Sequence, residues 1–135
     1  MIRMKEMANL HKEKSAFSFD ETCNRIYEFL KSRNVTVFTA VDHHENAVKA
    51  GLKLRPEKVI MFGSPLVGTH LMEENPDIGL ELPSKVLVYQ ENNLVYVVHA
   101  DYDDLRNDFH LSRSLEFVNK LASLVADLDS YATHP

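Results

Sequence analysis

The segment from residue 85 to residue 100 constrains the fold of this chain most. Two runs rich in Val and Tyr, residues 85–90 and 94–100, flank Glu91-Asn92-Asn93. Asn tolerates the turn conformations that join neighbouring antiparallel strands, so this pattern predicts a β-hairpin. A hairpin pairs its strands antiparallel, and the sheet that contains it must be at least partly antiparallel.

The rest of the chain mixes helical and strand patterns. Cys23, Ile26 and Leu30 recur at helical spacing after Asp20, which suits an N-cap. The β-branched run 35–41 and the apolar run 58–62 predict strands. We expect helices at 20–33, 43–50, 69–75 and from Ser112 or Ser114 to about 129, and a first strand within 13–19. These elements predict an α+β domain, a mostly antiparallel sheet with two long helices on one face.

Length and composition set the class of protein. The 135 residues suit one domain, with residues 1–12 poorly patterned, a core at 13–111 and a final helix at 112–130. A net charge of −5 without a basic run argues against nucleic acid or an anionic membrane as partner. Cys23 is the single cysteine, so no intramolecular disulfide forms. No signal peptide or long apolar run is present, which predicts a cytoplasmic protein.

The predicted hairpin carries large apolar side chains at both odd-numbered and even-numbered positions. Alternate residues of a strand face opposite sides of a sheet, so helices on one face leave apolar side chains on the other. A homodimer would cover that second face.

The first candidate site is Asp42-His43-His44-Glu45, a capping-box pattern at the start of a predicted helix. The partial positive charge of a helix N-terminus keeps imidazoles neutral, and a neutral imidazole can bind a metal or act as a base. Asp42 and His43 are therefore candidate ligands of a divalent metal, and His110 from later in the chain is added to them as a third candidate. In the alternative interpretation, Asp42 and Glu45 are caps and the histidines lie on the surface.

The second candidate site is the turn at 63–69, Gly-Ser-Pro-Leu-Val-Gly-Thr, which follows a predicted strand. Its glycine spacing is that of a phosphate-binding loop, but it lacks the lysine, and Pro65 removes a backbone N–H. This excludes a nucleoside triphosphate. A small anionic ligand at Gly63, Ser64, Gly68 and Thr69 remains open, beside the alternative that the glycines only serve a tight turn.

A third segment, His99-Ala100-Asp101-Tyr102-Asp103-Asp104, is acidic. It lacks the glycine and the distal Glu of an EF-hand loop, so a solvated turn is the better interpretation.

Five motifs resemble domain-of-unknown-function family 302, over roughly residues 15 to 111. Ser64 stands where the family usually has Asn, and Asn34 replaces a family glycine before the second strand. The resemblance implies a β-α-β-β-β-β-α fold similar to the half-saddle of TATA-binding proteins, a likeness of fold only. The motifs are Val41-Asp42-His43 with Ala47, Gly51-Leu52-Lys53-Leu54-Arg55-Pro56, Phe62-Gly63-Ser64-Pro65, Gly68-Thr69-His70-Leu71-Met72, and Leu82-Pro83-Ser84-Lys85-Val86-Leu87-Val88.

Three functions follow from these patterns, in order of preference. The first is a module that binds a small ligand or a divalent metal between the Asp42-His43 helix start and the Gly63–Thr69 turn. The second is a homodimeric interaction domain without a ligand. The third is a small enzyme with His43 as general base.

Overall fold

The computed structural model describes residues 9–135. Its five strands form one antiparallel sheet. The strand order is β1-β5-β4-β3-β2, so β1 and β2 are the edges. The predicted hairpin is confirmed as β4–β5, and its turn residues Asn92 and Asn93 adopt φ values of 53° and 65°. The strands are β1 Leu10–Lys14, β2 Thr36–Asp42, β3 Glu57–Gly63, β4 Ser84–Glu91 and β5 Leu94–Ala100.

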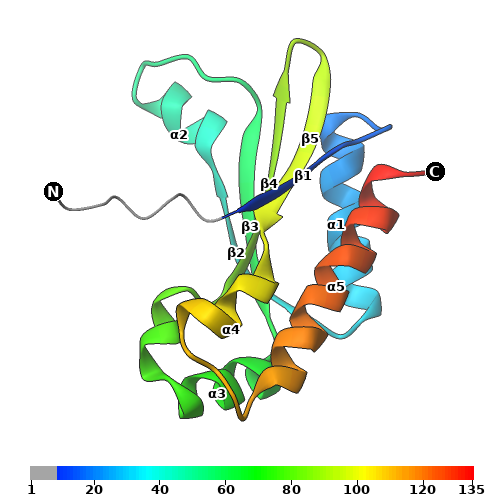
Figure 1. Ribbon diagram of the computed structural model, residues 1–135. Helices are drawn as coiled ribbons and strands as arrows, with labels where there is room; N and C mark the ends of the chain where they lie inside the picture. The colour runs from blue at the N-terminus through cyan, green and yellow to red at the C-terminus, as the bar shows by residue number, and fades with distance from the viewer. Residues whose placement is uncertain (1–8) are drawn as a thin grey trace, which may run out of the picture.

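Two long helices, α1 (Phe19–Ser32) and α5 (Leu115–Thr133), lie side by side on one face of the sheet (Figure 1). The predicted α+β class is confirmed. Shorter helices connect the strands: α2 His43–Lys49, α3 Pro65–Glu74, α4 Leu105–Asp108, and the 3₁₀ turns η1 Pro76–Leu80 and η2 Tyr102–Asp104.

The core lies between the sheet and these two helices. Alternate strand residues point into it, such as Val86 and Val88 of β4, while Leu87 between them faces the other way. Ile26 and Leu30 of α1 and Val118 and Leu128 of α5 meet them from the helical side, all fully buried.

Several element boundaries differ from those predicted. The first strand lies at 10–14 rather than within 13–19. Ser18, not Asp20, caps α1, because its Oγ accepts a hydrogen bond from Glu21 N at 3.1 Å. Helix α3 begins at Pro65 instead of residue 69, since proline fits the first turn of a helix. Thr69 is therefore not a cap, and no helix N-terminus follows Gly68.

Both termini of helix α2 have the capping residues that the sequence predicted. Asp42 Oδ1 accepts from Glu45 N at 2.9 Å at the N-terminus. At the C-terminus Gly51 adopts a φ of +76°, its N–H donates to Val48 O, and Leu52 N donates to Ala47 O at 2.8 Å. These two bonds form a Schellman motif, which requires a left-handed residue at the position of Gly51.

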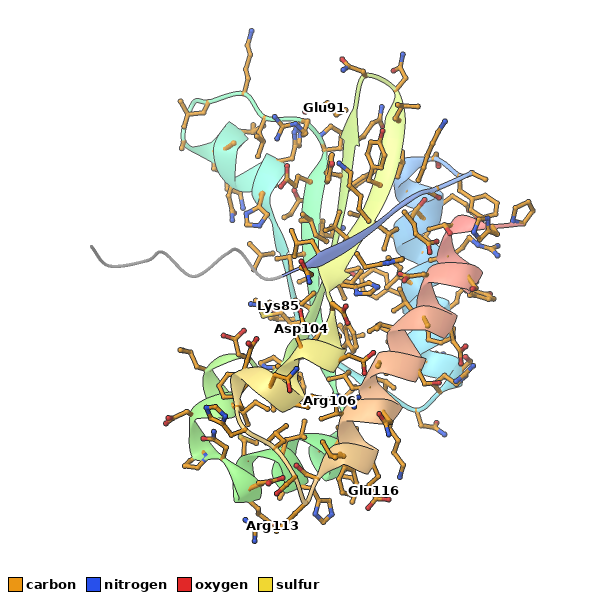
Figure 2. All side chains as sticks on the ribbon, viewed as in Figure 1. Lys85, Glu91, Asp104, Arg106, Arg113 and Glu116 are labelled. Carbon is orange, nitrogen blue, oxygen red and sulfur yellow. The ribbon has the colours of Figure 1, made fainter. Side chains whose placement is uncertain are left out.

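The start of α5 is held by a carboxylate from α3. Glu74 accepts hydrogen bonds from the backbone N–H groups of Ser112, Arg113 and Ser114 at 2.8–3.1 Å, and from Ser114 Oγ at 2.6 Å. Figure 2 shows Arg113 and Glu116 at this end of the molecule, beside α3. The Ser114 hydroxyl and the backbone donors lower the pKa of Glu74 from 4.5 to about 2. An ionised carboxylate thus satisfies the backbone donors of the segment that leads into α5, including that of the N-cap residue Ser114.

Candidate functional site

Strand pairing brings two histidines together on the helical side of the sheet. In the β1–β5 register His11 lies directly opposite His99. Cross-strand partners share one face of a sheet. The two rings stack with centroids 5.1 Å apart and planes inclined by 25°. Residues far apart in the sequence therefore present their imidazoles side by side.

Asp129 reaches the same point from α5. Its Oδ2 lies 2.7 Å from His99 Nε2 and 3.3 Å from His11 Nε2. Its Oδ1 is buried and has no hydrogen-bond partner among the described residues. Most buried polar atoms in proteins have a partner, so an orphan carboxylate oxygen in a native fold calls for an explanation.

A hydrogen bond to the backbone determines which ring nitrogen of a neutral His99 carries the hydrogen and which carries the lone pair. His99 Nδ1 lies 2.8 Å from Ala100 O, and because a carbonyl only accepts, Nδ1 carries the hydrogen. A neutral His99 would then turn the lone pair of Nε2 toward a carboxylate oxygen. Something positive must lie between them, either a proton on Nε2 or a cation.

Burial alone lowers the pKa of His99, but its hydrogen bonds to Asp129 and Ala100 and the nearby carboxylates outweigh burial and raise that pKa above 6.5. In the absence of a metal, the proton therefore takes the place between His99 and Asp129. A metal binding here would displace that proton.

The three groups have the spacing of a metal centre. One ligand atom from each of His11, His99 and Asp129 can be chosen so that all lie within 4.8 Å of one another, and no other such group of three occurs in residues 9–135. Ligands about 2.0–2.2 Å from a metal lie roughly 3–3.5 Å from each other. The separations of 2.7 and 3.3 Å are close to this range.

Supporting contacts surround the three groups. Ligand histidines usually donate their second ring N–H to a carbonyl or carboxylate, as His99 does to Ala100. Glu13 Oε1 lies 2.8 Å from His11 Nε2, the same nitrogen that faces Asp129, so a metal bound at this nitrogen would replace the hydrogen bond to Glu13. The side chain of His11 is 46% exposed, whereas His99 and Asp129 are buried. The cluster lines a hollow of about 410 Å³, so an ion could enter from solvent and keep an open coordination position.

The structure does not gather the predicted ligands Asp42, His43 and His110 into one group. Asp42 is occupied as the cap of α2, and the side chain of His43 makes no hydrogen bond to another described residue. His110 follows α4, which lies at the opposite end of the molecule from α2 in Figure 1. Next to His43, His44 Nδ1 lies 2.6 Å from Leu54 O and fastens α2 to the following loop.

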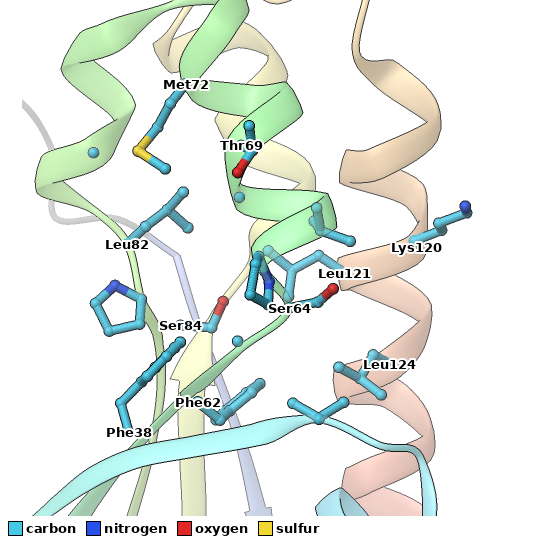
Figure 3. A pocket seen from close by; sticks show the side chains of 17 residues that line it. Phe38, Phe62, Ser64, Thr69, Met72, Leu82, Ser84, Lys120, Leu121 and Leu124 are labelled. Carbon is cyan, nitrogen blue, oxygen red and sulfur yellow. The ribbon is translucent and has the colours of Figure 1, made fainter.

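The predicted ligand-binding residues Gly63, Ser64, Gly68 and Thr69 do lie together, along the wall of a cavity of about 520 Å³ (Figure 3). Their surroundings are mostly apolar, with Phe38, Met72 and Leu124 among the lining residues. The cavity is formed by the end of β3, helix α3, the segment before β4 and one side of α5.

Sequence reasoning missed His11, His99 and Asp129 as a group. His11 fell in the segment treated as poorly patterned, and His99 was assigned to a solvated turn. Two signals were present: His99 shares the parity of Val95 and Val97, which are buried, and Asp129 falls four residues after Val125 on the buried side of α5. A charged residue on a core-facing stripe needs a partner.

Comparison with known proteins places the chain in a family. The sequence model described as domain of unknown function DUF302 matches residues 11–128. The chain belongs to this family. The crystal structure of an uncharacterised conserved DUF302 protein from Bacillus stearothermophilus is similar, with a TM-score of 0.80 over 90% of this chain and 97% of that chain. At 23% sequence identity this likeness shows a shared fold.

Curated relatives match part of the DUF302 domain. The fluoride-specific ion channels FluC 1 of Brucella suis biovar 1 and of Brucella abortus biovar 1 are each 42% identical over 79 residues, or 58% of this chain. The match covers 31% and 29% of those proteins, so the chain spans about a third of their length or less. Among residues 9–135, no helix has the length and apolar character needed to cross a membrane.

Proposed function

We propose that this DUF302 chain binds a divalent transition-metal ion through His11 Nε2, His99 Nε2 and the carboxylate of Asp129. The observation that carries the proposal is the buried Asp129 Oδ1, which has no hydrogen-bond partner in residues 9–135, in a carboxylate that already faces two imidazole nitrogens. A cation bound there satisfies the carboxylate and both nitrogens at once. The proposal keeps the divalent metal expected from the sequence and places it at other residues.

The ligand chemistry narrows the choice of ion. Two imidazoles and one carboxylate suit zinc, iron(II) and related transition metals better than magnesium or calcium, which prefer oxygen ligands. Zinc is the practical probe because it accepts these ligands in tetrahedral geometry with water in the remaining position.

A protonated His99 paired with Asp129 is the alternative that uses the same atoms. Among residues 9–135, this pair leaves Asp129 Oδ1 without a partner, and His11 then bonds to Glu13 at 2.8 Å with only a longer contact of 3.3 Å to Asp129. The two accounts therefore differ in what they predict for His11, which is a ligand in one and dispensable in the other.

The test is calorimetric titration of zinc chloride into tag-free, chelator-treated protein near neutral pH. We expect one zinc ion per chain and, in His11→Ala, affinity lower by at least about tenfold. His11 is half-exposed on an edge strand, so its loss leaves the core intact. His70→Ala is the matched control, since His70 is similarly exposed and lies outside the cluster.

A second control, His43→Ala, distinguishes the two candidate metal sites. Unchanged zinc affinity in this variant supports the His11 cluster. Loss of zinc binding in His43→Ala but not in His11→Ala would overturn the proposal and return the site to Asp42 and His43. Equal zinc binding in His11→Ala and the unmodified protein would also overturn it.

A homodimer is a second candidate, favoured by one row of side chains. Val41, Val59, Leu87 and Val98 stand in register across β2, β3, β4 and β5. They lie on the face of the sheet opposite α1 and α5, by alternation with the core residues. Val98 is already only 9% exposed, and a second copy packed on this face would bury the partly exposed Val41, Val59 and Leu87 further.

A further inference from the structure

The cavity at the Gly63–Thr69 turn has the dimensions of a small-molecule site. Its volume is about 520 Å³, within the roughly 300–1,000 Å³ usual for ligand pockets. An engineered cavity of about 150 Å³ already admits benzene. Two apolar side chains at its border are unusually exposed, Phe38 at 53% and Met72 at 40%. The wall thus offers an apolar surface that solvent can reach.

Few polar groups line the cavity, and none of those in the described residues is negatively charged. Among the described residues that line the cavity there is no carboxylate, although the chain has 20 Asp and Glu residues. Its one charged residue is Lys120 on α5, which extends outward at the rim (Figure 3). Lys120 Nζ contacts the face of the Phe117 ring at 5.2 Å and has no ion pair among the described residues. Lys120 Nζ thus lies outside the cavity over Phe117, and its flexible side chain is the positive charge among the described lining residues that could turn toward a bound anion.

Two hydroxyl groups of the wall are also unused. Ser64 stands at the N-cap of α3 but makes no side-chain capping bond. Neither the Ser64 nor the Thr69 side chain hydrogen-bonds to another described residue. Apolar walls with a small number of free hydroxyls and one cation are the usual composition of a site that fixes the orientation of an amphipathic ligand.

Two glycines keep the space open. A Cβ on Gly63 would lie 3.1 Å from Phe38 Cε2, so the Phe38 ring would have to shift by a few tenths of an ångström to make room for it. A Cβ on Gly68 would meet the ends of Leu82 and Met72 at 3.7 and 3.8 Å. A larger side chain at Gly68 would therefore fill space between these residues.

We propose that this cavity binds a small organic anion with an apolar body and one carboxylate, oriented with the carboxylate toward Lys120 and the hydroxyls. The proposal stands apart from the metal centre, since the two hollows share no lining residue within 9–135. It specifies the chemical class of the small anionic ligand that the sequence predicts at Gly63, Ser64, Gly68 and Thr69.

The test is titration of sodium octanoate into the full chain in the presence of a chelator, which prevents a carboxylate from reporting on a bound metal. We expect saturable binding of octanoate, no binding of acetate over the same concentrations, and at least tenfold weaker binding of 1-octanol. His11→Ala should bind octanoate as the unmodified chain does, so failure of the metal proposal leaves this one standing.

Two variants locate the site. We expect Gly68→Leu, which fills the cavity, to weaken octanoate binding at least tenfold. Because Gly68→Leu could disturb α3, the exposed Lys120→Glu provides a second variant, with binding weakened at least threefold. Lys31→Glu, an exposed charge reversal on α1, should leave binding unchanged. The proposal would be overturned if both Gly68→Leu and Lys120→Glu bound octanoate as tightly as the unmodified chain does. Tighter binding of 1-octanol than of octanoate, or no binding of octanoate, would also overturn it.

Discussion

Asp129 is the residue on which the candidate metal centre depends most. Its side chain is 4% exposed and lies on the buried side of α5, where an apolar residue would be the ordinary choice. Removing one member of a buried charged pair is costly because the other charge loses its partner inside the protein. In the metal-free protein that remaining charge is the protonated His99.

We predict that Asp129→Asn lowers the free energy of unfolding of the metal-free protein by about 3 kcal/mol. Urea titration followed by circular dichroism measures the change. Asp127→Asn is the matched control on the same helix, because Asp127 pairs with Arg33 at the surface, and an exposed pair contributes at most about 1 kcal/mol. Equal effects of the two substitutions would contradict the role assigned to Asp129.

Two glycines make a second prediction at the residue scale. Gly68 lies inside α3 with room for a Cβ, so Gly68→Ala should raise the free energy of unfolding by about 0.5–1 kcal/mol through helix propensity. Gly51 has a φ of +76° at the end of α2, so Gly51→Ala should lower it by about 1 kcal/mol. Thermal and urea unfolding of both variants should show these opposite signs, and two shifts of the same sign would refute the argument.

At the scale of elements, one ionised carboxylate of α3, Glu74, joins this helix to the start of α5, beside the stacked rings of His70 and Phe117. The pKa of Glu74 is about 2 in the folded protein against an ordinary 4.5. A lowered carboxyl pKa contributes stability above about pH 4.5, and this contribution is lost as the pH falls from about 4.5 to 2.

We predict that Glu74→Gln lowers the melting temperature by several degrees near neutral pH. The difference from the unmodified protein should shrink as the pH falls from about 4.5 toward 2, where Glu74 itself becomes protonated. Glu73→Gln is the control, since the neighbouring side chain is 68% exposed and has only His70 at 3.7 Å. A constant difference across this pH range would show that charge is not what Glu74 contributes.

Element types were predictable from the sequence, and element ends were less so. The β4–β5 hairpin, the α2 caps and the periodicity of α1 and α5 are local patterns, which neighbouring residues determine. Strand β1 was misplaced because its residues Leu10–Lys14 carry little apolar alternation, and its pairing with β5 is decided by tertiary contacts. The start of α3 was misplaced because Thr69 suits a cap as well as Pro65 suits a first turn.

At the scale of the whole molecule, the sheet has one face covered by helices and one face with a row of apolar side chains. We predict a homodimer, with a mass twice 15.5 kDa in light scattering coupled to size-exclusion chromatography. Leu87→Lys, a charge in the middle of the row, should halve that mass while the far-ultraviolet circular dichroism stays the same. A monomeric unmodified protein would contradict the prediction.

The candidate sites differ in how far the sequence could reveal them. Gly63, Ser64, Gly68 and Thr69 are close in sequence, and their shared cavity wall follows from one turn and the first part of α3. The His11, His99 and Asp129 cluster joins two strands and a helix that are far apart in the chain. Only the β1–β5 register and the packing of α5 on the sheet bring those residues together, and neither is encoded locally.

The measurement that tests the metal centre most directly is anomalous diffraction at the zinc edge from crystals grown with zinc chloride. The account predicts one strong peak per chain, about 2.0–2.2 Å from His11 Nε2, His99 Nε2 and an oxygen of Asp129. A peak at His43, or no peak beside Asp129 in crystals saturated with zinc, would contradict it.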